Sequence, residues 1–246
     1  MSDLILKENE RLDDLQLKGL KIIQRTDWFR FGIDAVLLAH FSNTPRDARV
    51  IDLGTGNGVI PLLLVGKYQP AEIVGLEIQS QVADLAERNV ALNGLTGTIR
   101  IVKGDIRECR QLFPQGYFDF VVSNPPYIVD GKGLLNESEV KSVSRHELLC
   151  SLDDILEASA SLLKFGGTLA MIHRPSRLTD ILFQMRTHEL EPKVIRFVHP
   201  TPGSRPNLVL VKGRKSGGKG LHVLEPLYIY DENGTYTDEI KEIYNI

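Results

Sequence analysis

The sequence has few cysteines, no metal-ligand spacing and no long apolar run, and each absence excludes a class of protein. Cys109 and Cys150 lie far apart, and no Cys-x-x-Cys or His-x-x-x-His spacing occurs. We therefore expect no zinc site, no other metal and no disulfide. No run of about 18 uncharged apolar residues occurs, so we expect no membrane span. The polar, acidic start is unlike a secretory signal, and we expect a cytoplasmic protein.

Net charge is also low, at −3, but it is unevenly distributed. The window 193–219 holds seven basic residues and no acidic one. The rest of the chain therefore holds the other 22 of the 29 basic residues and all 32 acidic residues. Such segregation favours one region that meets phosphates, although a solvated loop is the alternative. Three residues of this window are candidate RNA contacts: Lys212, Arg214 and Lys215.

From about residue 49 the chain alternates short apolar runs with helical patterns. Alternating elements of this length predict an α/β fold: a Rossmann-like, seven-stranded, mostly parallel sheet with helices on both faces. Strands are expected at 49–54, 72–78, 98–106, 118–124, 168–174, 193–199 and 207–214. Helices are expected at 59–69, 80–94, 152–167 and 177–190.

Two segments flank this pattern. Residues 1–48 predict a hairpin, in which 20–24 pairs with 28–31, and a helix from about Asp34. Residues 214–246 predict a flexible basic loop, a hairpin around Asn233-Gly234 and a short helix. We expect these additions and the central domain, 49–213, to form one globular unit.

A glycine cluster, DLGTGNG, lies between the first expected strand and its helix. Gly54, Gly56 and Gly58 let the backbone turn tightly and approach a ligand, beside the free N–H groups of a helix N-terminus. A dinucleotide fold prefers Gly-x-Gly-x-x-Gly, whereas this spacing is Gly-x-Gly-x-Gly with Asp52 two residues earlier. An ordinary strand–helix turn is the alternative.

The cluster resembles motif I of class I S-adenosylmethionine-dependent methyltransferases, in which this turn cradles the methionine end of the cofactor. Glu77 ends the second expected strand, where ligands of open α/β sheets bind, and a carboxylate there can accept bonds from ribose hydroxyls. The resemblance also implies that Asp105, after the third strand, contacts the adenine amino group. Either acid alone can instead be a helix cap or a surface charge. The turn residues expected at the cofactor are Asp52, Gly54, Gly56, Asn57 and Gly58.

The tetrad Asn124-Pro125-Pro126-Tyr127 ends the fourth expected strand, next to the presumed cofactor. Prolines fix the backbone and donate no N–H, so the Asn124 side-chain oxygen and the Pro125 carbonyl are available to grip both hydrogens of a planar amino group. This favours a tetrahedral nitrogen whose lone pair faces the sulfonium methyl. Tyr127 offers a face on which an extruded base can stack.

The motif order resembles the amino-methyltransferases of class I, and the segment GLKIIQRTDWFRFGIDAVLLA is similar to the entry region of the bacterial tRNA1(Val) adenine-N6 methyltransferase group. In that group a residue at the position of Asp34 and its helix cap the cofactor, which Asn124 also contacts. The resemblance implies N6 methylation of adenine 37 in valine tRNA, with residues 49–213 as the catalytic domain.

Four alternatives share parts of this pattern. Release-factor glutamine methyltransferases carry the tetrad, but a helical domain of several dozen residues precedes their glycine turn. Ribosomal guanine-N2 methyltransferases often have Phe last and a duplicated domain, and DNA adenine methyltransferases usually have a target-recognition domain. A catalytically silent RNA-binding module is the non-enzyme alternative, which the intact turn and tetrad oppose.

Further basic residues are candidate RNA contacts. The loop after Tyr127 is long enough to be a lid that orders on RNA, and an acidic–basic linker is the alternative. Two basic residues, one at the end of the strand expected at 168–174 and one after the strand expected at 193–199, lie at the same edge of the sheet. The candidates are Lys132, Arg145, Arg174 and Arg205.

Overall fold

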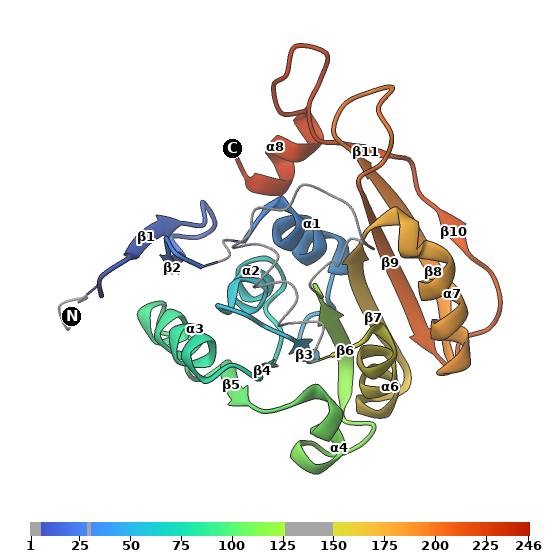
Figure 1. Ribbon diagram of the computed structural model, residues 1–246, viewed down its shortest axis with the longest axis horizontal. Coiled ribbons are helices and arrows are strands. Elements are labelled where there is room, and N and C mark those ends of the chain that lie inside the picture. The colour runs from blue at the N-terminus through green and yellow to red at the C-terminus, as the bar shows by residue number, and fades with distance from the viewer. Residues whose placement is uncertain (1–5, 29–30, 126–149) are drawn as a thin grey trace.

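The structure is a computed structural model that describes residues 6–28, 31–125 and 150–246 (Figure 1). Its centre is one sheet with the strand order β10-β8-β9-β7-β6-β3-β4-β5, and β11 also pairs with β8. Two strands of two residues, β10 (His222–Val223) and β11 (Leu227–Tyr228), add to the seven predicted ones, which all form. These are β3 (Arg49–Leu53), β4 (Glu72–Glu77), β5 (Ile99–Lys103), β6 (Phe118–Ser123), β7 (Leu163–His173), β8 (Leu190–His199) and β9 (Leu208–Lys215).

The sheet is mostly parallel, as predicted. Strands β5, β4, β3, β6 and β7 pair in parallel, and β9 is antiparallel to both β7 and β8. The short β8–β9 connection holds no crossover helix, and a parallel pair would need one. All predicted strands except β9 therefore end at one edge of the sheet, called here the carboxyl edge.

Helices cover both faces of the sheet (Figure 1). One apolar cluster holds residues of α1 (Ile33–Ser42), α2 (Val59–Tyr68), α3 (Ser80–Leu92) and α8 (Asp238–Tyr244). The other holds residues of α4 (Cys109–Leu112), α6 (Leu152–Leu162) and α7 (Leu178–Thr187). No helix of the described ranges is long and apolar enough to cross a membrane.

The N-terminal hairpin differs from the prediction. Strand β2 (Lys21–Arg25) pairs with β1 (Glu10–Asp14), and not with 28–31. All five residues of β1, ERLDD, are exposed or half-buried in a two-stranded ribbon, so this strand needs no apolar alternation and can be largely charged. The predicted helix at Asp34 is confirmed as α1.

Strand β7 also begins earlier than predicted. The expected helix 152–167 ends at Leu162, and Leu163 is already extended, with φ −69° and ψ 137°. Gly166, at φ 73°, lies in a bulge where the pairing of β6 with β7 shifts register. The glycine pair therefore bends a strand instead of ending a helix.

Two of the three elements predicted for residues 214–246 are confirmed, the turn around Asn233-Gly234 and the short helix, whereas residues 214 and 215 of the predicted basic loop belong to β9. Residues 230 and 236 form a single antiparallel bridge around Asn233-Gly234, and α8 follows. Helix α8 packs against α1, so the C-terminal segment covers the helix that carries Asp34.

Candidate active site

The glycine turn joins β3 to α2 at the carboxyl edge. Its three glycines have φ values of 77°, 58° and 83°, which disfavour any residue with a Cβ. The backbone N–H groups of Gly54 and Thr55 both donate to the carbonyl of Leu76 on β4, at 3.0 Å. A Cβ on Gly54 or Gly56 would meet nothing within 4 Å, so this side of the turn faces open space that a ligand can fill.

Glu77 is locked against this turn. Its Oε2 accepts the N–H of Gly56 at 3.0 Å, and its Oε1 accepts the N–H of Gln79 at 2.9 Å, just before α3 begins. The side chain is 5% exposed. Each carboxylate oxygen keeps a second acceptor position, so Glu77 is held in place and can still accept bonds from a ligand.

Asp52 lies behind the turn and is fully buried. Neither of its carboxylate oxygens has a hydrogen-bond partner within the described residues, and the hydroxyl of Thr55 has none either. The pKa of Asp52 is raised to about 7, chiefly by burial; the neighbouring Thr55 hydroxyl opposes this rise and the Glu77 carboxylate adds to it. A buried carboxylate without a partner stores unfavourable free energy that a cationic ligand relieves.

Asn124 follows β6 and joins Asp34 of α1. The side-chain Nδ2 of Asn124 donates to Asp34 Oδ2 at 3.0 Å, and Ser123 just before it donates to the carbonyl of Leu53 at 2.9 Å. A Cβ on Gly32 would lie 2.8 Å from Asp34 Oδ1, so glycine leaves room for the Asp34 carboxylate. The structure thus brings together two predicted site residues that lie 90 positions apart in the sequence.

The rest of the tetrad is only partly described. Pro125 is buried, and Pro126 and Tyr127 lie outside the described residues. The predicted roles of these three residues stay predictions.

Asp105 is a helix cap in the structure, which was the alternative to its predicted contact with adenine. It caps the 3₁₀ turn η1 (Ile106–Glu108) by accepting the N–H of Arg107 at 2.9 Å. Its hydrogen bonds from the Arg107 guanidinium hold the pKa of this carboxyl below its usual range. Contact between Asp105 and an adenine amino group stays a prediction.

The site is acidic, which bears on the kind of ligand it accepts. Within the described chain, none of Asp34, Asp52 and Glu77 forms an ion pair with Lys or Arg. A pyrophosphate would be repelled here, whereas a cation would be attracted. In the same residues, no group of three His, Cys, Asp or Glu side chains is placed to hold a metal ion.

Two predicted RNA contacts lie at the carboxyl edge. Arg174 follows β7, and its Nη1 donates to the carbonyl of Asn207 at 3.2 Å. Arg205 is exposed in the loop between β8 and β9. Lys132 and Arg145 lie outside the described residues.

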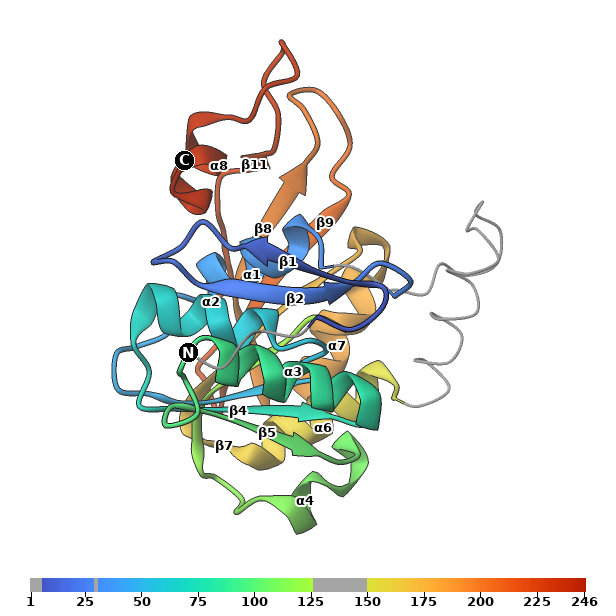
Figure 2. The same ribbon diagram turned by 90° about the vertical axis from the view of Figure 1, so that its left-hand side faces the viewer.

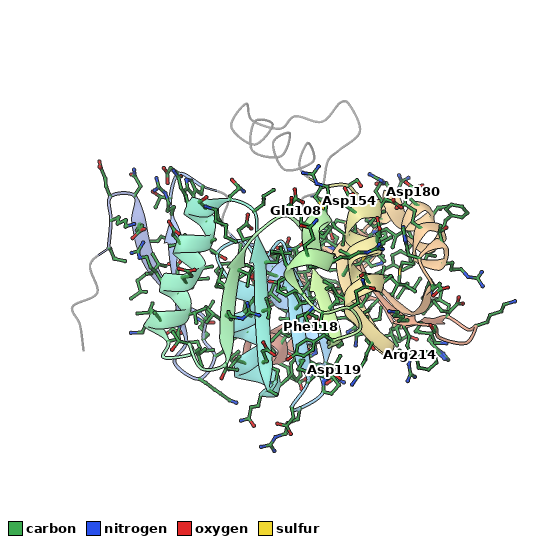
Figure 3. All side chains as sticks on the ribbon, turned by 90° about the horizontal axis from the view of Figure 1, so that it is seen from below. Glu108, Phe118, Asp119, Asp154, Asp180 and Arg214 are labelled. Carbon is green, nitrogen blue, oxygen red and sulfur yellow. The ribbon has the colours of Figure 1, made fainter. Side chains whose placement is uncertain are left out.

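The other three predicted RNA contacts do not join them. Because β9 runs antiparallel to β7, Arg214 pairs with Thr168 near the opposite edge. Figure 3 shows Arg214 and Asp119 toward one end of the strands, and Glu108 and Asp154 toward the other. The Lys212 ammonium lies 4.7 Å from the centroid of the Phe41 ring. Lys215 Nζ donates to the carbonyl of Leu163 at 2.7 Å. Their contact with RNA stays a prediction, but they form no patch beside Asn124.

The sequence analysis did not identify Asn89, a residue that supports the glycine turn. Asn89 of α3 is fully buried; its Oδ1 accepts the N–H of Ile23 at 2.6 Å, and its Nδ2 donates to the carbonyls of Ile23 and Asn57. It thereby joins β2 to the glycine turn. Asn93, one helical turn later, makes the same pair of bonds to Lys21. The Asn-x-x-x-Asn spacing is the signal for this contact, because it places two amides on one helix face.

We expect Asn89→Ala to lower the free energy of unfolding by about 2–4 kcal/mol, because both backbone groups of buried Ile23 lose their partner. Asn93→Ala is the matched control: its bonds to Lys21 are exposed to water, so the loss is about 1 kcal/mol or less. Urea denaturation of both variants measures the difference. Equal losses would show that burial of the Asn89 amide contributes nothing.

The comparisons with known proteins agree with this geometry. The family model of the methyltransferase small domain matches residues 32–182. A tRNA1(Val) (adenine(37)-N6)-methyltransferase from Bacteroides thetaiotaomicron is 33% identical over 74% of this chain and 75% of that protein. One from Pedobacter heparinus is 29% identical over 92% and 94%.

The fold is shared with solved methyltransferases. The crystal structure of a predicted O-methyltransferase from Agrobacterium tumefaciens has a TM-score of 0.71 to this chain, at 23% identity, over 86% of this chain and 95% of that one. The chain is a methyltransferase: it belongs to the methyltransferase small domain family and is related to enzymes named tRNA1(Val) (adenine(37)-N6)-methyltransferases.

Proposed function

We propose that the chain transfers the methyl group of S-adenosylmethionine to N6 of an adenine in tRNA, adenine 37 of a valine tRNA by likeness to its relatives. The observation that carries the proposal is the hydrogen bond between Asn124 and Asp34 at the carboxyl edge, beside the glycine turn. It places an amide acceptor next to a group of carboxylates suited to a cationic cofactor.

The residues present fit S-adenosylmethionine, which supplies a methyl group activated on a sulfonium and also carries an ammonium. Asp34 and Asp52 complement these positive charges, and the open side of Gly54 and Gly56 leaves room for the methionine part. The spare acceptor positions of Glu77 suit the ribose hydroxyls. Asp105 accepts a hydrogen bond from the adenine amino group in this proposal, after its bonds to the Arg107 side chain rearrange.

The role of Asn124 follows from which end of its amide is held. The Asp34 carboxylate only accepts hydrogen bonds, so the NH2 end of Asn124 faces it and the oxygen end is turned away. That oxygen and the Pro125 carbonyl accept the two hydrogens of the exocyclic amino group. Fixing both hydrogens aims the nitrogen lone pair at the activated methyl, so positioning replaces a strong base.

The proposal predicts that tRNA nucleosides from cells lacking the gene contain less N6-methyladenosine, and that the purified chain with S-adenosylmethionine restores it. Mass spectrometry of digested tRNA, before and after this incubation, measures both amounts. An Asn124→Ala chain is the control for a contaminating activity. Labelled methyl on a release-factor glutamine, or on guanine N2 of ribosomal RNA, would replace the proposal by one of its alternatives.

A further inference from the structure

A cleft of about 260 Å³ lies between the N-terminal hairpin and α3, apart from the glycine turn. Its walls come from β1, β2, the residues next to them and α3, and Figure 2 shows both strands alongside this helix. Helix α3 begins three residues after Glu77, so this part of the helix lies at the carboxyl edge. Residue Trp28 is six positions before Asp34, which limits their Cα separation to roughly 20 Å.

The cleft contains a prebuilt flat stack. The guanidinium carbon of Arg25 lies 4.4 Å from the centroid of the Trp28 ring. Asp27 holds this guanidinium edge-on, with Nε to Oδ1 at 2.9 Å and Nη2 to Oδ2 at 2.6 Å. Both bonds use the edge of the guanidinium, so they leave its two planar faces uncovered, and Arg25 and Trp28 are both only half-buried. Planar nucleobases stack on such aromatic and guanidinium faces.

The charges of the cleft leave one cation uncommitted. Arg88 binds Glu10 through two hydrogen bonds of 2.6 and 2.8 Å, which joins β1 to α3 and neutralises both groups. Two lining residues form no ion pair with any described residue: Lys7, which precedes β1, and Asp84 of α3. Lys7 is therefore the cation of the lining that no described carboxylate pairs with. An ammonium beside a flat stack is suited to a nucleotide, whose base stacks while its phosphate meets the positive charge.

We propose that this cleft binds an unpaired nucleotide of the RNA substrate close to the target adenine, with its base on the Trp28–Arg25 stack and its phosphate at Lys7. This inference rests on the proposed function, because it takes the substrate to be RNA. It assigns the N-terminal hairpin to substrate binding, and Asn89 and Arg88 anchor that hairpin to α3.

The only tryptophan of the chain, Trp28, reports directly on the cleft. We expect its fluorescence to be quenched when an anticodon stem-loop of valine tRNA is titrated into the protein saturated with S-adenosylhomocysteine. The quench should saturate at the Kd that filter binding gives for the same RNA. RNA binding without a quench, or a full quench by the cofactor alone, would overturn the proposal.

Variants separate the stack from the fold. Trp28→Ala should raise the Kd for the stem-loop about 10- to 100-fold, the effect of one lost stacking partner, and Trp28→Phe should raise it less. Cofactor affinity and the thermal midpoint should stay unchanged. Arg11→Ala, which removes an exposed cation of the same hairpin outside the cleft, should leave RNA affinity near that of the wild type.

The outcomes distinguish the two proposals. If the wild type binds and methylates the RNA but Trp28→Ala binds it equally well, only the cleft proposal fails. If the wild type binds no tRNA and methylates another substrate, the proposed function and the cleft proposal fail together.

Discussion

Replacing Asn124 with alanine lowers kcat by about 10²- to 10³-fold, the size of effect seen when one preorganised polar group of a catalytic site is removed. Cofactor affinity changes much less, because the glycine turn and Glu77 do not depend on Asn124. Under the proposed function the reason is positional: without the amide oxygen, one hydrogen of the amino group would be free and the nitrogen would stay planar. Single-turnover methyl transfer and calorimetric titration of the cofactor measure the two effects separately.

Asp34→Asn is the informative companion variant. An amide at position 34 can turn either end toward Asn124, so the orientation of the Asn124 oxygen is no longer dictated by a carboxylate. We expect kcat to fall by less than in Asn124→Ala, and cofactor affinity to fall because a carboxylate facing a cation is lost. Equal turnover in wild type and Asn124→Ala would remove Asn124 from the catalytic assignment and favour a silent binding module.

Sequence patterns predicted the strands and turns whose conformation is determined by neighbouring residues in the sequence. The apolar runs that become β3, β4 and β6 are buried on both faces, so they are continuous and easy to recognise. The glycine turn needs three left-handed residues, and only glycine adopts that conformation without strain. The resemblance assigned both Asp34 and Asn124 to the cofactor, but their hydrogen bond depends on how α1 packs against the sheet, which the strand order does not give.

The features that were missed depend on tertiary contacts. The charged strand β1 has no apolar alternation, because it lies at the edge of a two-stranded ribbon. The role of Asn89 could not be predicted from its own helix, because it depends on the backbone N–H and carbonyl of Ile23 on β2. The basic window is one cluster in the sequence, but the antiparallel direction of β9 carries Arg214 and Lys215 away from the carboxyl edge.

The unpaired Asp52 carboxyl makes the stability of the ligand-free protein depend on pH. Its pKa is raised from 3.8 to about 7 on folding, chiefly by burial. Below pH 3.8 both states are protonated; between 3.8 and 7 the unfolded chain is ionised while the folded chain keeps the proton. Folding therefore takes up a proton in this interval, and the free energy of unfolding falls as pH rises, by roughly 4 kcal/mol in total, before it levels off above pH 7.

Asp52→Asn removes this titration, and its unfolding free energy should lose the corresponding slope. The quantity to measure is the difference in unfolding free energy between wild type and variant, by urea denaturation from pH 5 to pH 8. Other groups titrate alike in both proteins and cancel in the difference, including His173, whose pKa burial lowers to about 4. Relative to the wild type, the variant should gain stability steadily up to about pH 7. A constant difference would mean that Asp52 is already ionised in the folded protein.

The same variant connects stability to ligand binding. A sulfonium and an ammonium near Asp52 favour its ionised form, so a bound cationic cofactor should lower the raised pKa and flatten the pH dependence of the wild type. The cofactor should then stabilise the wild type more at pH 8 than at pH 5, and Asp52→Asn equally at both. A thermal-shift titration with S-adenosylhomocysteine, which keeps the ammonium but lacks the sulfonium, separates the two positive charges. If both ligands flatten the profile to the same extent, the ammonium alone is the partner of Asp52.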